Sequence, residues 1–110
     1  MLRRARWGLL ALWLLLSGCA PARLPHATLA WQTSSEFNVA GFVIERGDAP
    51  VGPFERVSAL IPSGDDPFVR HDYEYVDRTV AAGRTYYYQL VTIDNRNARV
   101  IAGRLAAEAN

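Results

Sequence analysis

The sequence contains no lysine and a single cysteine, and each shortage excludes a class of function or structure. All 12 basic residues among the 110 are arginine, and 11 acidic residues nearly balance them. This balance supplies no concentrated basic surface, so binding to nucleic acid is not expected. The one cysteine, Cys19, has no partner for a disulfide within the chain.

The residue patterns that usually mark catalysis or cofactor binding are also missing. The sequence has no glycine-rich phosphate loop and no serine motif of the nucleophile-elbow kind. Its two histidines, His26 and His71, are far apart, and the acidic pair Asp65 and Asp66 has the character of a solvated loop. We therefore expect no catalytic residues, no metal site and no cofactor.

The N-terminal segment has the pattern of an export signal. Three arginines within the first six residues precede an apolar run from Trp7 to Leu16, and small residues follow it. As a helix this run would span about 15 Å, roughly half of a bilayer's hydrocarbon core, so a transmembrane segment is not expected. We predict that residues 1–18 are a signal peptide. The remaining 92 residues then carry a net charge of about −2.

The end of this segment indicates how the protein is anchored. Leu16-Ser17-Gly18-Cys19 resembles the lipobox of bacterial lipoproteins in all four positions. The resemblance implies that the Cys19 thiol carries lipid, with acyl chains such as palmitate, and becomes the first residue after cleavage. Ala20, in place of an aspartate, resembles the signal that sorts lipoproteins to the outer membrane. Residues 19–26, broken by two prolines, are then a lipid-anchored tether.

The rest of the chain predicts a small all-β domain over residues 27–108. Apolar and polar residues alternate in short runs, turn residues recur about every ten positions, and no sustained helical period is present. The last few residues are expected to fray. The predicted strands cover residues 27–33, 41–46, 54–60, 72–77, 83–94 and 98–105.

The order of these residues resembles the fibronectin type III family. Leu29-Ala-Trp31 resembles its strand B, Gly41-Phe-Val-Ile-Glu-Arg46 its strand C, and Ala82-Gly83-Arg-Thr-Tyr86 the entry to its strand F. The resemblance implies an immunoglobulin-like antiparallel β-sandwich of six to seven strands. It also implies that the Tyr86 hydroxyl bonds to the backbone just upstream. Only residues 20–26 remain to form strand A, so that strand is expected to be short or missing.

A closer resemblance is to the branch of this family in bacterial surface and secreted proteins. It covers residues 27–105, nearly all of the predicted mature chain. The matching pieces are Trp31 to Glu36, Gly41 to Arg46, Gly52 to Phe54, Tyr73 to Asp77 and Tyr86 to Leu90.

The longest predicted strand has two different faces. Tyr86, Tyr88 and Leu90 are assigned to the core by the period of two. The opposite face then carries the outward apolar residues of a possible contact face for a partner. These outward residues are Tyr87, Val91 and Ile93, together with Val43 on the adjacent strand. A neighbouring strand or the C-terminal tail would cover them equally well.

These patterns predict a function in the cell envelope that is not enzymatic. The first hypothesis is a membrane-anchored lipoprotein whose domain binds an envelope protein, for instance by accepting a strand at the edge that strand A leaves open. The alternatives are a glycan- or peptidoglycan-binding accessory lipoprotein and a structural or assembly component of an envelope complex. Arg46-Gly47-Asp48 matches an adhesion tripeptide, but we interpret it as the turn after a strand.

Overall fold

The computed structural model describes residues 2–7, 10–15 and 24–110, and for the first two segments it describes the backbone alone. These residues form strands and loops and contain no helix, so none of them provides a helix that could cross a bilayer. The strands are β1 (Leu2–Trp7), β2 (Leu10–Leu15), β3 (Ala27–Thr33), β4 (Val39–Gly47), β5 (Glu55–Arg56), β6 (Ile61–Pro62), β7 (His71–Asp77), β8 (Thr85–Asp94) and β9 (Arg99–Glu108).

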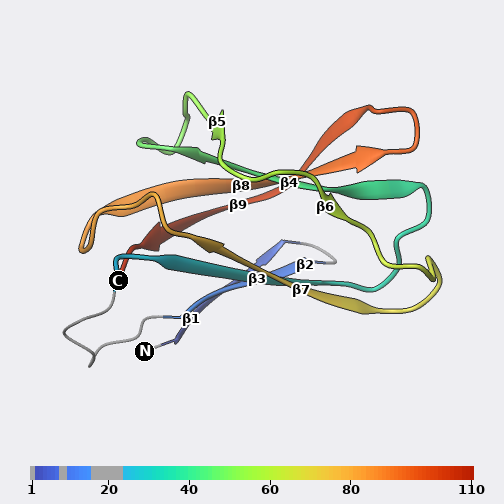
Figure 1. The fold of residues 1–110 in the computed structure, drawn as a ribbon, viewed down its shortest axis with the longest axis horizontal. Coiled ribbons are helices and arrows are strands. Elements are labelled where there is room, and N and C mark those ends of the chain that lie inside the picture. The colour runs from blue at the N-terminus through green and yellow to red at the C-terminus, as the bar shows by residue number, and fades with distance from the viewer. Residues whose placement is uncertain (1, 8–9, 16–23) are drawn as a thin grey trace.

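The strands form two antiparallel sheets that face each other (Figure 1). One sheet has the order β1-β2-β3-β7. The other has the order β5-β4-β8-β9, with the short β6 also paired to β4. All pairs within both sheets are antiparallel. The described chain is therefore a β-sandwich, as the sequence predicts.

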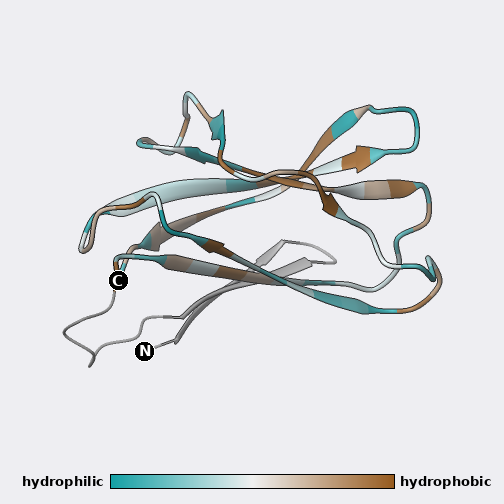
Figure 2. Ribbon diagram, in the orientation of Figure 1, coloured by the Kyte–Doolittle hydropathy of each residue, from teal (hydrophilic) through white to brown (hydrophobic). Residues whose placement is uncertain are grey.

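The core lies between the sheets and is built from the alternating apolar residues of β3, β4 and β8. Trp31 is 1% exposed, stacks on Tyr73 with ring centroids 5.4 Å apart, and meets the ring of Phe42 edge-on at 5.7 Å. Tyr86, Tyr88 and Leu90 are buried, as their spacing predicts. In Figure 2 the hydrophobic colour follows β3, β4 and β6. Other buried members of the core are Ala27, Leu29, Ile44, Val80, Ala107 and Ala109.

The turn into β8 has the geometry that the fibronectin resemblance implies. The Tyr86 hydroxyl accepts a hydrogen bond of 2.8 Å from the backbone N–H of Ala81. Gly83, inside this turn, has a φ of 78°, a backbone conformation that side chains with a Cβ adopt at a cost. The predicted tyrosine corner is confirmed, and it fixes the crossover between the two sheets.

The predicted strand over residues 54–60 is wrong, since only the two-residue strands β5 and β6 form in this part of the chain. The cause is a side chain that replaces a ladder bond. The Ser58 hydroxyl accepts the N–H of Ile44 at 2.8 Å, while the carbonyl of Ile44 accepts the N–H of Val57 at 2.9 Å. The β4 edge is thus satisfied by an irregular segment.

The C-terminal tail does not fray, contrary to the prediction. β9 continues to Glu108, and Ala109 is 2% exposed. Asn110 and His26 exchange two backbone hydrogen bonds of 2.9 and 3.1 Å, and Gly83 donates to the carbonyl of Ala109 at 2.9 Å. The C-terminus and the start of β3 therefore meet at one end of the sandwich (Figure 1). His26, assigned to the tether, belongs to the folded domain.

The outer edge of β3 is occupied differently from what the sequence suggests. Among residues 24–110 no strand pairs with this edge. Instead β2 pairs with it at two positions, Trp13 with Ala30 and Leu14 with Leu29. Residues 10–15, rather than residues 20–26, hold the place of strand A in the full-length chain.

Candidate functional site

A buried carboxylate, Asp77, joins the two sheets at the end where β7 finishes. Its side chain is 1% exposed and accepts a hydrogen bond of 2.8 Å from Arg46 on β4 and another of 2.8 Å from Tyr88 on β8. Thr79 adds its hydroxyl at 2.7 Å and its backbone N–H at 3.0 Å. Every oxygen of this carboxylate is therefore used by the protein itself.

The electrostatics of this cluster keep Asp77 ionised. Burial alone raises the pKa of Asp77, but the donors of Thr79, Arg46 and Tyr88 outweigh it, and the net effect lowers the pKa. Burial and the adjacent carboxylate raise the pKa of Tyr88, which therefore stays a hydrogen-bond donor. The arrangement is an ion pair that stabilises the fold, with Asp77 fully buried and the Arg46 side chain 21% exposed.

This cluster also accounts for the tripeptide Arg46-Gly47-Asp48. The Arg46 guanidinium binds Asp77 and both the hydroxyl and the carbonyl of Thr79, at 2.8 and 3.1 Å. Asp48 is exposed and pairs with Arg84 at 3.1 Å. β4 ends at Gly47, so the tripeptide lies at the end of that strand, with Asp48 in the turn after it. The arginine is occupied by the buried Asp77.

A second buried carboxylate, Glu36, lies at the opposite end of β7, in the loop between β3 and β4. Glu36 as a whole is 2% exposed. Thr33 donates to it at 2.9 Å, the N–H of Gly64 donates at 2.8 Å, and the Tyr73 hydroxyl makes a short hydrogen bond. His71 Nδ1 lies 3.1 Å from the carboxylate, an ion-pair distance without hydrogen-bond geometry.

The pKa of Glu36 follows the same balance as that of Asp77. Burial raises it, but the hydrogen bonds from Tyr73, Gly64 and Thr33, together with the nearby His71, lower it further than burial raises it. Gly64 leaves no room for a Cβ, which would come within 2.1 Å of the His71 ring. Glu36 therefore ties two loops to β7 at one point. The polar loop does not predict that Glu36 is buried. Glu36 appeared in the sequence analysis only as the last residue of the segment 31–36 that resembles the bacterial fibronectin branch.

The surface above Glu36 carries an exposed aromatic pair. Phe37 is 72% exposed and Phe68 is 75% exposed, and their ring centroids lie 6.1 Å apart. Beside them is a hollow of about 360 Å³. Its lining residues are Glu36, Phe37, Asn38, Val39, Ser63, Gly64, Asp65, Pro67 and Asn95. We call this surface, with Phe68, the loop-end groove; the sequence analysis did not identify it.

The contact face predicted from the sequence needs a correction at two of its four residues. Val43 is 4% exposed and Val91 is fully buried, so neither presents a surface to a partner. The reason is their place within the sheet: Val91 lies between Val43 on one side and Ile101 on the other. Tyr87 and Ile93 are half-buried, and their role in binding stays a prediction.

Polar side chains cross the same face beside the valines. Glu45 accepts hydrogen bonds of 2.6 Å from both Gln89 and Arg99, and Arg104 donates to Gln89 at 2.9 Å. This chain of contacts joins β4, β8 and β9. The outer face of the sheet is therefore held together by its own polar groups.

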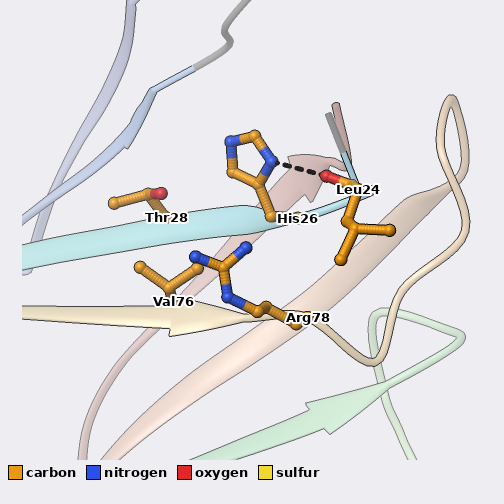
Figure 3. A pocket seen from close by; sticks show the side chains of 5 residues that line it. All are labelled: Leu24, His26, Thr28, Val76 and Arg78. Atoms are coloured by element: carbon orange, nitrogen blue, oxygen red, sulfur yellow. Dashed lines mark hydrogen bonds between the residues drawn. The ribbon is translucent and has the colours of Figure 1, made fainter. Parts of the chain in front are cut away.

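Another hollow, of about 400 Å³, lies where the chain enters β3 (Figure 3). Thr28 and Val76 are cross-strand neighbours at its base. His26 Nδ1 is 3.1 Å from the carbonyl of Leu24, and Arg78 completes the lining. This hollow therefore lies over the paired strands β3 and β7, near the point where the chain enters β3.

Other predicted features fall outside these clusters. Cys19 lies outside the described residues, so its lipidation stays a prediction. Within the described ranges, no group of three or more His, Cys, Asp or Glu side chains is placed to hold a metal ion.

Comparison with known proteins identifies the fold. An Fn3-like protein from Clostridium thermocellum superposes with a TM-score of 0.57 over 74% of this chain and 73% of that chain, at 21% identity. The fold is fibronectin type III-like.

The sequence comparison finds a related segment in a much larger protein. An amylopullulanase from Thermoanaerobacter thermohydrosulfuricus is 28% identical over 83 residues, which are 74% of this chain. The chain spans only 5% of the length of that enzyme. No family model matches the chain.

Proposed function

We propose that this protein is a non-enzymatic interaction module of the bacterial cell envelope, anchored by lipid on Cys19. Its fibronectin type III-like domain binds an envelope protein by accepting a strand at the outer edge of β3. The anchor would hold the domain near the outer membrane, because four residues separate Cys19 from Leu24, the first residue of the described domain.

The observation that carries this proposal is the unequal pairing of β3. On one side it pairs with β7 at all seven of its residues, and on the other side with β2 at only two. Removal of residues 1–18 as a signal peptide would leave this second side without a partner strand from residues 24–110. An edge of this kind offers a row of backbone donors and acceptors to an extended segment.

The side chains along this edge suit an added strand. Leu29 and Trp31 point into the core and fix β3 in place. Ala30 alternates with them to the other face and is small enough to let a second backbone approach.

Two features support a role without catalysis. The buried carboxylates Glu36 and Asp77 take hydrogen bonds from the protein itself, so neither is available as a general base. The related segment is a small fraction of the amylopullulanase, which fits an accessory module better than a catalytic domain.

The anchor is tested with a Cys19→Ser variant. We expect the wild-type protein to incorporate labelled palmitate and to sediment with membranes, and the variant to do neither. A variant that still sediments with membranes, together with a wild type that takes up no label, would exclude a lipid anchor. The mass of the purified protein would also show whether residues 1–18 are removed.

The binding edge is tested by placing a charge on it. Ala30→Lys puts an ammonium on the edge strand β3. Its cross-strand neighbour on β7 is Glu74, whose opposite charge should keep the substitution compatible with the fold. In cells treated with a cross-linker, we expect the wild type to join one envelope protein in a stoichiometric complex and Ala30→Lys to lose it. Val100→Lys, on the exposed β9 edge, is the matched control and should retain the complex. Loss in both variants, or in neither, contradicts the β3 edge as the binding site.

A further inference from the structure

The loop-end groove has an aromatic surface that lies largely in solvent. Phe37 and Phe68 come from different loops, are each more than 70% exposed, and lie with their rings inclined at 42° to one another. Large aromatic side chains are usually buried, because each removes a large apolar area from water. Two of them side by side in solvent indicate a surface that a ligand covers.

The two loops that carry these rings are fixed to each other. The N–H of Glu36 donates to the carbonyl of Pro67 at 2.8 Å, which joins the residues directly before Phe37 and Phe68. The Glu36 carboxylate holds the N–H of Gly64, and Asp66 accepts the N–H of Phe68 at 2.9 Å. The rings are therefore presented by a hydrogen-bonded frame, which reduces the entropy lost when a ligand binds.

The polar groups beside the rings select among ligand classes. Asn38 and Asn95 offer neutral donors and acceptors, and Asp65 is an exposed carboxylate. The Ser63 hydroxyl donates to the carbonyl of Val39 at 2.7 Å and offers an acceptor. Among the residues that the structure describes, none with a cationic side chain lines the groove. This charge pattern disfavours phosphate-bearing and other anionic polymers, and it favours a neutral ligand whose hydroxyl groups donate to carboxylate and amide oxygens.

We propose that the loop-end groove binds a neutral polysaccharide. The C–H faces of the sugar rings pack on Phe37 and Phe68, whose π-faces carry partial negative charge. The sugar hydroxyls donate to Asp65 and to the side-chain oxygens of Asn38 and Asn95. A sugar chain provides apolar faces and neutral hydroxyls in alternation, which matches the rings and the polar rim in this groove.

This site is separate from the protein-binding edge proposed above. The groove is formed by the loops that follow β3, β6 and β8, whereas the edge runs along β3 toward His26 at the other end of the sandwich. Ala30→Lys should therefore leave polysaccharide binding unchanged. Changes at Phe37 or Phe68 should leave the cross-linked envelope complex unchanged.

The test is electrophoresis of the purified protein through native gels that contain soluble starch, hydroxyethyl cellulose or laminarin. We expect at least one of these neutral polysaccharides to retard the wild-type protein. Phe37→Ala and Phe68→Ala should each weaken that retardation about tenfold. Val51→Ala is the matched control, since Val51 is an apolar residue, 87% exposed, in the loop after β4. Because all three side chains are exposed, the variants should fold, and near-ultraviolet circular dichroism would confirm it.

Three outcomes would overturn the proposal. No retardation by any of the three polysaccharides would exclude a neutral glycan as the ligand. Equal retardation of the wild type and both phenylalanine variants would move binding away from this groove. An equal loss in Val51→Ala would mean that the retardation reflects general stickiness of apolar surface.

Discussion

The two ends of the sandwich each contain a buried carboxylate, and the two are used differently. Asp77 takes donors from β4 and β8, so it ties one sheet to the other. Glu36 takes donors from Gly64 and Tyr73, so it ties loops to the end of one sheet. The same chemistry, an ionised acid surrounded by donors, makes a structural clamp at one end and a rigid support for an exposed surface at the other.

Removal of the Asp77 carboxylate should have the largest effect on stability. Asp77→Ala leaves the Arg46 guanidinium, only 21% exposed, and the buried Tyr88 hydroxyl without their partner. We expect a loss of about 3–4 kcal/mol in the free energy of unfolding, measured by urea denaturation. Asp48→Ala removes an exposed ion pair and should cost less than about 1 kcal/mol. Similar losses in the two variants would contradict the role of Asp77 as a clamp between sheets.

A change at Glu36 should cost less in global stability and act mainly on the loops. Glu36→Gln keeps one acceptor oxygen but replaces the other with an NH₂ group, which donates. That group would face donors that bond to the carboxylate in the wild type. We expect a loss of about 2 kcal/mol, since buried donors lose part of their bonding. Hydrogen exchange should speed up at the amide of Gly64, while the amide of Ala81, which bonds to Tyr86, should keep its protection. Equal changes at both amides would show that Glu36 stabilises the whole sandwich instead.

The pH dependence of stability should separate the two carboxylates further. The folded-state pKa of each is lowered, so the stability that each contributes is complete above its unfolded value and is lost as the pH falls through the folded one. For Glu36 this loss begins near the ordinary value of 4.5, and for Asp77 near 3.8. The difference in unfolding free energy between wild type and Glu36→Gln should therefore shrink as the pH falls from 5 to 3. A difference that stays constant would mean that the Glu36 charge contributes nothing.

The sequence predicts the parts of this fold that depend on a period of two. β3 has the predicted bounds, and the burial of Tyr86, Tyr88 and Leu90 follows from their alternation on a strand that needs a covered face. The tyrosine corner was predicted through the resemblance of residues 82–86 to the fibronectin type III family, and the hydrogen bond from Ala81 to Tyr86 confirms it.

What the sequence does not predict depends on contacts between distant residues. Ser58 replaces a backbone partner of β4, and Glu36 is buried by groups from the loop before β7 and from β7 itself. Val91 is buried on the outer face because it lies between Val43 on β4 and Ile101 on β9. The sequence does not predict the aromatic pair either, because Phe37 and Phe68 are 31 positions apart. In the sequence each is a single apolar residue within a loop.

The smallest expected effect on stability is that of the exposed rings, and it sharpens the contrast between the two ends. Phe37→Ala and Phe68→Ala remove side chains that are already more than 70% in solvent, so each should change the free energy of unfolding by no more than about 0.5 kcal/mol. Urea denaturation beside Asp77→Ala would measure this. A loss of 2 kcal/mol or more in either variant, as for a buried side chain, would mean that the rings stabilise the loops. A negligible loss would mean that folding does not require the two rings.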